Sequence, residues 1–335
     1  MSQKSNIGIV GGGAWGTALA QAMASVSTPG GEQNDVVIWA RETEVCESIN
    51  SAHENRLYLK NLPLSPTISA TSQLKDIADC DTLLLVTPAQ HLRATLKALP
   101  KTDAALILCA KGIEADTQML MSEVTQEICP DNPMAVLSGP TFAHEVAAGL
   151  PTAVTLACQD QQLWERLSKQ IARPHFRPYF SDDIVGAEIG GAVKNVLAIG
   201  CGVVEGYGLG QNARSALISR GFAEMVRFGK ARGARTETLS GLSGLGDLVL
   251  TCSSQSSRNF TLGYGLGKGQ SANELLADRH TVAEGASTAP VLHAAATKLG
   301  IEMPIVEAVH ALLSGKQTAS ETIGMLLGRP LKAEH

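Results

Sequence analysis

The feature that most limits how this 335-residue chain can fold is a glycine-rich loop close to its start. Gly11, Gly13 and Gly16 form the pattern G-x-G-x-x-G, which directly follows an apolar run at 7–10 and opens a helix-like segment. A second apolar run follows at 36–39. This order is typical of a dinucleotide-binding βαβ unit: the first glycine allows a tight turn, the second admits a pyrophosphate, and the third lets helix and strand pack closely. The alternative is a glycine turn that binds nothing.

Strand-like and helix-like segments alternate through the first half of the chain. The strand-like runs are solidly apolar, as expected for parallel strands covered on both faces. They lie at 7–10, 36–39, 82–86, 105–108, 134–137 and 153–156. Helical periodicity is found at 15–27, 42–52 and 116–128. This pattern predicts an α/β fold with a Rossmann-type, doubly wound, mostly parallel sheet.

The second half of the chain has a different sequence pattern, because it contains no strand-like runs beyond about residue 183. Segments rich in Ala, Gly and Leu replace them, at 184–205, 212–232, 271–278, 286–299, 304–314 and 318–327. These segments predict an all-α C-terminal domain. We place the domains at 1–185 and 186–335, which agrees with the usual size of protein domains.

Composition excludes several classes of protein. The net charge is −5, so a broad nucleic-acid interface is not expected. The seven cysteines contain no CxxC pair, which favours a reducing compartment over a disulfide framework, and no zinc motif is present. The start lacks a signal-peptide core, and no uninterrupted apolar run is long enough for a transmembrane helix. We expect a cytoplasmic enzyme without a membrane span or a metal ion.

The end of the second strand-like run indicates which dinucleotide is bound. NAD-preferring folds usually carry an acidic residue there, which binds the ribose 2′-hydroxyl. This chain has Arg41 at that place, and a guanidinium suits a 2′-phosphate. We therefore predict that the cofactor is NADP, with NAD as a possible second cofactor. The alternative is a solvated surface arginine.

A nearly apolar helix at 188–204 contains Lys194 and Asn195 in its middle. Gly190, Gly191 and Ala198 lie about one turn away and leave space beside the amine. Burial lowers the pKa of a lysine readily, which suits a proton donor for a carbonyl oxygen. A lysine whose head reaches water is equally compatible with this pattern.

A second cluster follows at 241–252, where glycines predict a flexible loop and Asp247 opens an apolar helix. Asp247 is either a simple helix cap or a carboxylate that orients Lys194. Ser257, Arg258 and Asn259 stand at a predicted helix start, where an arginine beside small polar residues suits a phosphate. The alternative for that segment is an exposed loop.

Further candidates follow strands at the carboxyl edge, where α/β sheets bind ligands. Lys111 follows the run at 105–108, and Gly139 and Thr141 follow the run at 134–137. Each of these positions is also compatible with an ordinary turn.

Together these segments resemble one family, the bacterial type of NAD(P)-dependent glycerol-3-phosphate dehydrogenase. The similar segments run in order along nearly the whole chain: 11–20 (GGGAWGTALA), 54–59 (ENRLYL), 137–152 (LSGPTFAHEVAAGLPT), 188–195 (EIGGAVKN), 241–252 (GLSGLGDLVLTC), 257–259 (SRN) and 282–285 (VAEG). The resemblance implies reversible reduction of dihydroxyacetone phosphate to sn-glycerol 3-phosphate, a precursor of phospholipids. It also implies a Rossmann domain followed by a helical domain.

The resemblance assigns roles to individual residues. It implies that Lys194 is the catalytic general acid and base, oriented by Asp247 and Asn195, and that Arg258 holds the substrate phosphate. It implies substrate contacts at Lys111, Gly139, Asp247, Thr251, Ser257, Arg258 and Asn259, and cofactor contacts at Ala14, Trp15, Arg41, Lys111, Ala143, Arg258, Val282 and Glu284. This chain departs from the family at Ala14, where Ser is frequent, and at 27–34, which is longer and more polar than usual and predicts a surface loop.

Two other functions stay open at this stage. One is a two-domain dehydrogenase of the 2-hydroxyacid or ketopantoate type, which acts on a carboxylate substrate. The other is a protein that senses NADP without catalysis. For any of these we expect a homodimer, the commonest assembly of soluble proteins.

Overall fold

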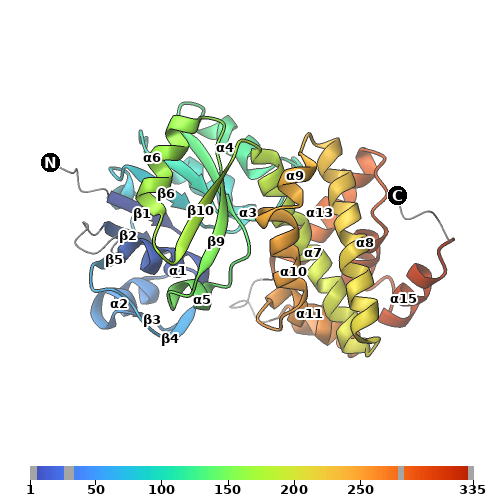
Figure 1. Cartoon of the computed structure of the whole chain (residues 1–335). Helices are drawn as coiled ribbons and strands as arrows, with labels where there is room; N and C mark the ends of the chain where they lie inside the picture. The colour runs from blue at the N-terminus through green and yellow to red at the C-terminus, as the bar shows by residue number, and fades with distance from the viewer. Residues whose placement is uncertain (1–5, 26–33, 278–282, 331–335) are drawn as a thin grey trace.

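The computed structural model describes residues 6–25, 34–277 and 283–330. It consists of two lobes side by side, one built on a β-sheet and one of helices alone (Figure 1). The sheet has eight strands in the order β10-β9-β8-β7-β6-β1-β2-β5. Only the β8–β9 pair is antiparallel. The predicted doubly wound, mostly parallel sheet followed by a helical region is therefore confirmed.

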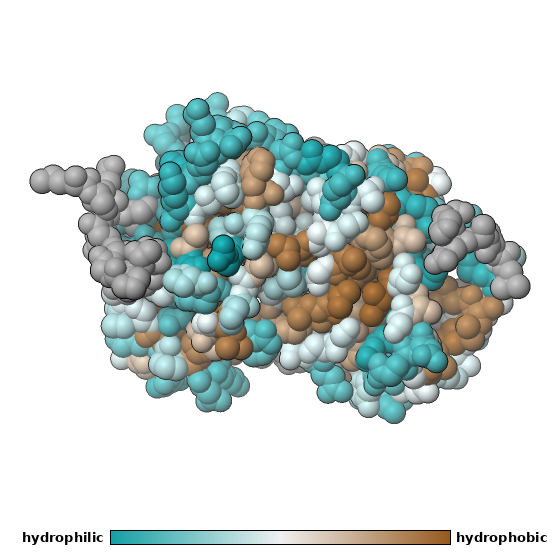
Figure 2. Space-filling model, in the orientation of Figure 1, coloured by the Kyte–Doolittle hydropathy of each residue, from teal (hydrophilic) through white to brown (hydrophobic). Residues whose placement is uncertain are grey.

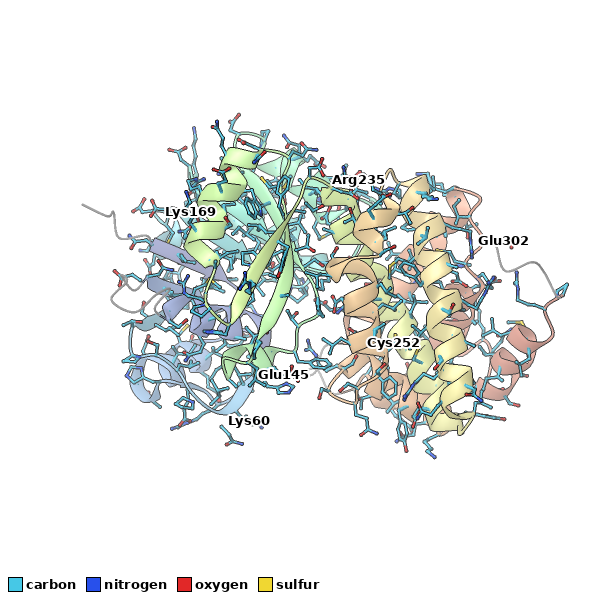
Figure 3. The ribbon with its side chains drawn as sticks, in the orientation of Figure 1. Lys60, Glu145, Lys169, Arg235, Cys252 and Glu302 are labelled. Atoms are coloured by element: carbon cyan, nitrogen blue, oxygen red, sulfur yellow. The ribbon has the colours of Figure 1, made fainter. Side chains whose placement is uncertain are left out.

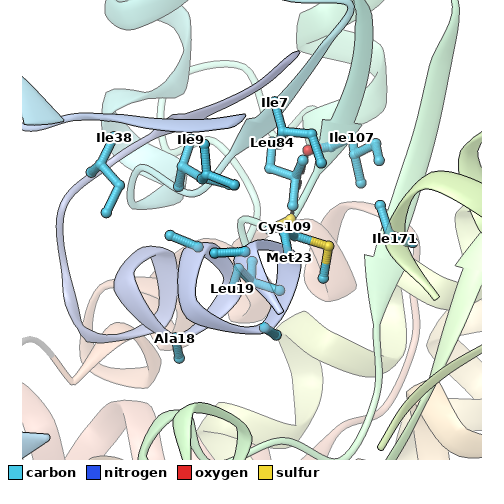
Figure 4. Close-up of a cluster of buried hydrophobic side chains, with 14 of the residues drawn as sticks. Ile7, Ile9, Ala18, Leu19, Met23, Ile38, Leu84, Ile107, Cys109 and Ile171 are labelled. Atoms are coloured by element: carbon cyan, nitrogen blue, oxygen red, sulfur yellow. Dashed lines mark hydrogen bonds between the residues drawn. The ribbon is translucent and has the colours of Figure 1, made fainter. Parts of the chain in front are cut away.

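The central strands are apolar on both faces because helices cover both sides of the sheet. The strands of the sheet are β1 (Asn6–Val10), β2 (Asp35–Trp39), β5 (Ile68–Thr71), β6 (Thr82–Leu85), β7 (Ala105–Leu108), β8 (Met134–Ser138), β9 (Thr152–Ala157) and β10 (Phe176–Ser181). Figure 4 shows Ile7, Ile9 and Ile38 of the sheet facing Leu19 and Met23 of the first helix, all fully buried. This contact fixes the first helix against the strand that precedes the glycine loop.

In the described part of the sheet lobe, six α-helices and the short 3-10 helix η1 (Leu74–Ile77) accompany the sheet. The α-helices are α1 (Ala14–Ala24), α2 (Thr43–Ala52), α3 (Ala89–Ala98), α4 (Met121–Ile128), α5 (Ala143–Ala147) and α6 (Gln161–Ile171). The sequence did not predict α3, α6, β5, β10 or the short hairpin of β3 (Glu54–Asn55) and β4 (Leu59–Pro63). Strand β10 contains Pro178, which argues against a central strand. Proline is tolerated there because β10 lies at the edge of the sheet.

The helical lobe is arranged around α7, whose residues are almost all buried. Its elements are α7 (Ile184–Tyr207), α8 (Gly210–Ala231), α9 (Thr236–Leu239), the π-helical turn η2 (Leu242–Gly246), α10 (Asp247–Cys252), α11 (Arg258–Gly267), α12 (Ala272–Leu275), α13 (Glu284–Lys298), α14 (Pro304–Leu313) and α15 (Ala319–Leu327). Helix α11 packs closely on α7, since a Cβ on Gly263 would lie 1.9 Å from the Ile199 carbonyl oxygen.

Two segments that the sequence predicts as loops have different outcomes in the structure. The glycines at 241–246 do not form the predicted flexible loop; they form η2, a turn of π-helix that leads directly into α10. The predicted surface loop at 27–34 lies outside the described residues except for Asn34, whose amide donates to the carbonyls of Met23 and Gln170.

Helix α7 is, among the described residues, the one helix long and apolar enough to cross a membrane. However, 94% of that apolar stretch is buried inside the protein, which identifies α7 as a core helix. Strand β10 ends at Ser181 and α7 begins at Ile184, so only two residues separate the last strand of the sheet lobe from the first helix of the helical lobe. The proposed boundary between 1–185 and 186–335 falls in the first turn of α7 and stays a prediction.

Candidate active site

The glycine loop has the backbone geometry that its sequence predicts. Gly11 has a φ of +130°, and a Cβ there would lie 3.0 Å from the backbone of Val86. A Cβ on Gly16 would lie 1.9 Å from the Gly11 carbonyl oxygen, so only glycine lets α1 start this close to β1. A Cβ on Gly13, in contrast, would meet nothing within 4 Å. The loop therefore leaves open space at Gly13, at the start of α1.

The start of α1 suits the pyrophosphate of a dinucleotide. Gly13 caps the helix without a side-chain hydrogen bond, and the first turn carries no acidic residue, so its N–H groups are available to an anion. Ala14 and Trp15 are partly exposed there, and Ala143 is the first residue of α5. The indole N–H of Trp15 is buried without a hydrogen-bond partner in the described structure. These features fit the dinucleotide predicted for this loop.

Arg41 follows β2 and its side chain is 79% exposed. Its guanidinium lies 3.0 Å from a carboxylate oxygen of Glu42. The arginine is thus available at the position predicted for a 2′-phosphate, but a neighbouring carboxylate competes for it.

Lys194 of α7 and Asp247 of α10 form a buried ion pair at the seam where the helical lobe meets the sheet lobe. Lys194 Nζ lies 2.5 Å from Asp247 Oδ1 and 3.0 Å from Thr251 Oγ1. Asp247 is fully buried, and Lys194 is 5% exposed. The carboxylate comes from the first residue of α10, whose last residue, Cys252, is labelled in Figure 3. The sequence left open whether Lys194 is buried or reaches water, and in the structure it is buried and paired with Asp247.

A second lysine joins the pair from the sheet lobe. Lys111 follows β7, and its Nζ lies 2.8 Å from Asp247 Oδ2 and 3.3 Å from the Gly139 carbonyl oxygen. Asp247 thus holds one ammonium group on each carboxylate oxygen. The sequence placed Lys111 at the carboxyl edge of the sheet but did not predict this ion pair, because 136 residues separate the two partners.

The pKa of Lys194 is lowered to about 8. Burial is the largest cause, the Asp247 carboxylate opposes it, and the charge of Lys111 lowers the pKa further. An amine with this pKa can hold a proton or release it close to neutral pH, as a general acid and base must.

Asn195 has a different partner from the one expected. Its side-chain carbonyl accepts a hydrogen bond from the Asn259 amide at 2.9 Å, and the Asn259 carbonyl accepts one from the Gly285 N–H at 2.9 Å. The direct contacts that orient Lys194 come instead from Asp247 and Thr251. Asn195 is nevertheless part of a chain of hydrogen bonds that ties α7, α11 and α13 together.

The predicted phosphate segment lies at the start of α11, as expected. Ser257 is its cap: its hydroxyl accepts a hydrogen bond from the N–H of Phe260 at 3.2 Å. Arg258 is exposed and forms no ion pair within the described ranges. Glu284 is close enough for Arg258, Lys111 and Lys194 to act on it: burial raises the pKa of its carboxyl, and these three cations lower it.

The remaining predicted residues fall around the same seam. Gly139 has a φ of +151°, and its carbonyl also accepts the hydroxyl of Thr141 at 3.3 Å. The predicted free space beside Lys194 is filled: Gly190 faces the backbone of Ser243, and Gly191 faces Lys111. Val282 lies outside the described residues.

Comparison with known proteins gives a consistent picture. Residues 6–164 match the family described as NAD-dependent glycerol-3-phosphate dehydrogenase N-terminus, and residues 183–324 match its C-terminus. Proteins named glycerol-3-phosphate dehydrogenase [NAD(P)+] are 61% identical in Erythrobacter litoralis, over 329 residues, and 62% identical in Novosphingobium aromaticivorans, over 330 residues. Each comparison covers 98% of both chains.

Solved structures agree with these matches. The crystal structure of glycerol-3-phosphate dehydrogenase from Coxiella burnetii superposes with a TM-score of 0.91 at 37% identity, and covers 97% of this chain and 99% of that one. A ketopantoate reductase from Ralstonia eutropha has a TM-score of 0.61 at 16% identity, covering 95% of this chain and 99% of that one, which shows a common fold alone.

Proposed function

This chain belongs to the family of NAD-dependent glycerol-3-phosphate dehydrogenases, and from that premise we propose how its own residues carry out the reaction. The protein is an NAD(P)-dependent oxidoreductase that interconverts dihydroxyacetone phosphate and sn-glycerol 3-phosphate. The ketopantoate-type and sensor alternatives are not favoured by these relatives. What remains to be assigned is the role of each side chain.

Lys194 is the proposed general acid. When bound, the reduced nicotinamide supplies the hydride for C2 of the ketone. The Lys194 ammonium gives its proton to the ketone oxygen as that oxygen gains charge, which leaves a neutral amine. In the opposite direction the neutral amine takes the proton from the hydroxyl. The observation that carries this assignment is the buried Lys194–Asp247 contact of 2.5 Å, which fixes the amine at the seam between the lobes.

Asp247 and Lys111 support the same step. The Asp247 carboxylate bonds both ammonium groups and stabilises the charged form of Lys194, which is the form that donates. Lys111 brings a second positive charge to the seam, where it contacts the substrate and offsets negative charge on the substrate oxygen or phosphate. Thr251 restrains Lys194 through its hydroxyl.

The substrate phosphate is assigned to the start of α11. Arg258 is exposed there without an ion pair in the described chain, beside the first N–H groups of a helix of ten residues. Asn259 is held by Asn195 and Gly285, so it fixes the position of this segment. Binding energy from the phosphate, remote from the reacting carbon, then orients the ketone toward Lys194.

The cofactor is assigned to the glycine loop, with NADP preferred through Arg41 and NAD also accepted. Backbone N–H groups at the start of α1 bind the pyrophosphate, so the missing hydroxyl at Ala14 removes one contact and leaves the others. Trp15, Ala143 and Glu284 are assigned to the same cofactor site. Lys111 and Arg258 are assigned contacts with both the cofactor and the substrate.

We also propose a cytoplasmic homodimer. Figure 2 shows apolar side chains gathered over the helical lobe, and exposed apolar residues of that lobe include Tyr207, Leu209 and Val249. Sedimentation equilibrium at several concentrations tests the dimer, and a monomer at all of them contradicts it.

The decisive experiment follows loss of reduced-nicotinamide absorbance with dihydroxyacetone phosphate and NADPH, repeated with NADH and with a carboxylated ketone in place of the phosphate ester. We expect turnover of the phosphate ester with both cofactors and none of the carboxylate. Turnover of the carboxylate alone contradicts the assignment of the phosphate site.

A further inference from the structure

Glu188 is a buried carboxylate on α7 that the proposed mechanism does not use. It is 5% exposed, and no cation bonds it among the described residues. Its two oxygens accept hydrogen bonds from the backbone N–H of Ser122 at 2.8 Å and from the Ser122 hydroxyl at 2.5 Å. Burial raises the pKa of this carboxyl to about 7. Burying such a carboxylate without a cation costs free energy.

Ser122 lies directly after the segment that carries Lys111. That segment runs from the end of β7 at Leu108 to the start of α4 at Met121. Glu188 therefore binds the first turn of α4, immediately after the Lys111 segment. The bond joins the sheet lobe to the same helix that carries Lys194.

The middle of the Lys111 segment is held separately by α3. The Gln90 amide donates to the Ile113 carbonyl at 2.8 Å, and the Gln90 carbonyl accepts from the Ala115 N–H at 2.9 Å. Arg93 bonds Glu114 at 2.8 Å. These contacts lie within the sheet lobe, so they shape the segment but do not fix its position relative to α7.

Glu188 and Lys194 are six residues apart on one helix, about 9 Å along its axis at 1.5 Å per residue. A shift of α4 against α7 would therefore move Lys111 relative to Lys194, and both ammonium groups must reach Asp247. We infer that Glu188 is a positioning residue: its bonds to Ser122 hold the Lys111 segment in register with Lys194. This inference rests on the proposed roles of the two lysines.

Glu224 offers a matched control. It is also buried, at 2% exposure, and it also accepts hydrogen bonds from backbone N–H groups at a helix start, from Ile305 at 2.8 Å and Val306 at 3.3 Å. Burial raises the pKa of this carboxyl to about 7 as well. It joins α8 to α14 within the helical lobe and forms no hydrogen bond or ion pair with the site residues that the structure describes.

The test compares Glu188→Gln with Glu224→Gln in the full chain, measuring the melting temperature, kcat and KM for dihydroxyacetone phosphate. We expect similar changes in melting temperature. Only Glu188→Gln should lower kcat/KM, by about tenfold, because small displacements of catalytic groups have effects of this order or larger. Equal losses of kcat/KM in the two variants would overturn the inference. If Glu188→Gln does not fold, the milder variant Ser122→Ala takes its place in this comparison. We expect Ser122→Ala to lower kcat/KM as well.

A double-mutant cycle separates positioning from general packing. In a Lys111→Met background, Glu188→Gln should change kcat/KM by less than about twofold, because the group that it positions is gone. A full, additive loss in that background would show that Glu188 does not act through Lys111. If wild-type protein did not reduce dihydroxyacetone phosphate, the proposed function would fail first, so the two failures are distinguishable.

Discussion

The glycine loop of the sheet lobe works through the backbone, whereas the lysine–aspartate cluster works through side chains. Gly11 and Gly16 are needed because a Cβ would lie too close to backbone atoms. For Gly11 these atoms belong to Val86, directly after the adjacent strand β6, and for Gly16 they belong to Gly11 itself. Asp247, in contrast, bonds Lys194 across 53 residues and Lys111 across 136. The first site forms within the sheet lobe alone, whereas the second is complete, with Lys111, only after the two lobes have packed.

This difference determines how each site should respond to substitution. A site made of backbone atoms loses function when an added side-chain atom occupies the space of the ligand or of neighbouring backbone, so its failures are steric. A buried charge cluster is coupled, so removing one member leaves the others unpaired and changes their pKa values. Variants at each site can therefore distinguish a steric failure from the loss of a charge.

The largest effect is expected from Lys194→Ala. This substitution removes the proposed proton donor, and general acid catalysis contributes about 10²–10⁴ in rate, so kcat should fall by at least about 10². Steady-state kinetics with NADPH and dihydroxyacetone phosphate measure it. Lys268→Ala is the control, because Lys268 lies in the turn that follows α11, over the Tyr264 ring and 5.5 Å from its centroid. Activity of Lys194→Ala close to that of Lys268→Ala would refute the role of Lys194.

Asp247→Asn should change the pH dependence as well as the rate. In the reducing direction the ammonium form of Lys194 is active, so activity is present below its pKa of about 8 and is lost as the pH rises through it. The Asp247 carboxylate raises that pKa, so its removal should move the loss of activity to lower pH. The free energy of unfolding should fall by about 3–5 kcal/mol, as for other broken buried pairs. A pH profile of kcat that keeps its descending limb in place would contradict this account.

The glycine loop should fail in two distinguishable ways. Gly13→Ala meets no atom within 4 Å, so the melting temperature should be unchanged while the Kd for NADPH rises about tenfold, or about 1.4 kcal/mol. Gly16→Ala places a Cβ 1.9 Å from the Gly11 carbonyl oxygen, so both the melting temperature and the affinity should fall. Thermal melts and NADPH fluorescence titrations separate the two. Unchanged affinity in Gly13→Ala would place the pyrophosphate elsewhere.

The same contrast explains which features could be predicted from the sequence. The apolar strands, the glycine loop and the helical second half follow local patterns, and the structure confirms them. Strand β10 was missed because Pro178 argues against a strand until its edge position is known. The Lys111–Asp247 pair was missed because no local pattern links two residues on different lobes. For Asn195, the sequence indicated a place beside Lys194, but its partner, Asn259, depends on how α11 packs against α7.

The smallest effect is expected at Arg41, which would add one side-chain contact to a cofactor site made mainly of backbone N–H groups. Arg41→Ala should raise the KM for NADPH about fivefold, corresponding to about 1 kcal/mol for an exposed ion pair, and should leave the KM for NADH nearly unchanged. The effect is limited because Glu42 already bonds the guanidinium at 3.0 Å. Glu42→Gln should therefore lower the KM for NADPH, since it frees Arg41 for the 2′-phosphate. Equal changes in the KM for NADPH and the KM for NADH in Arg41→Ala would show that the guanidinium does not bind the 2′-phosphate.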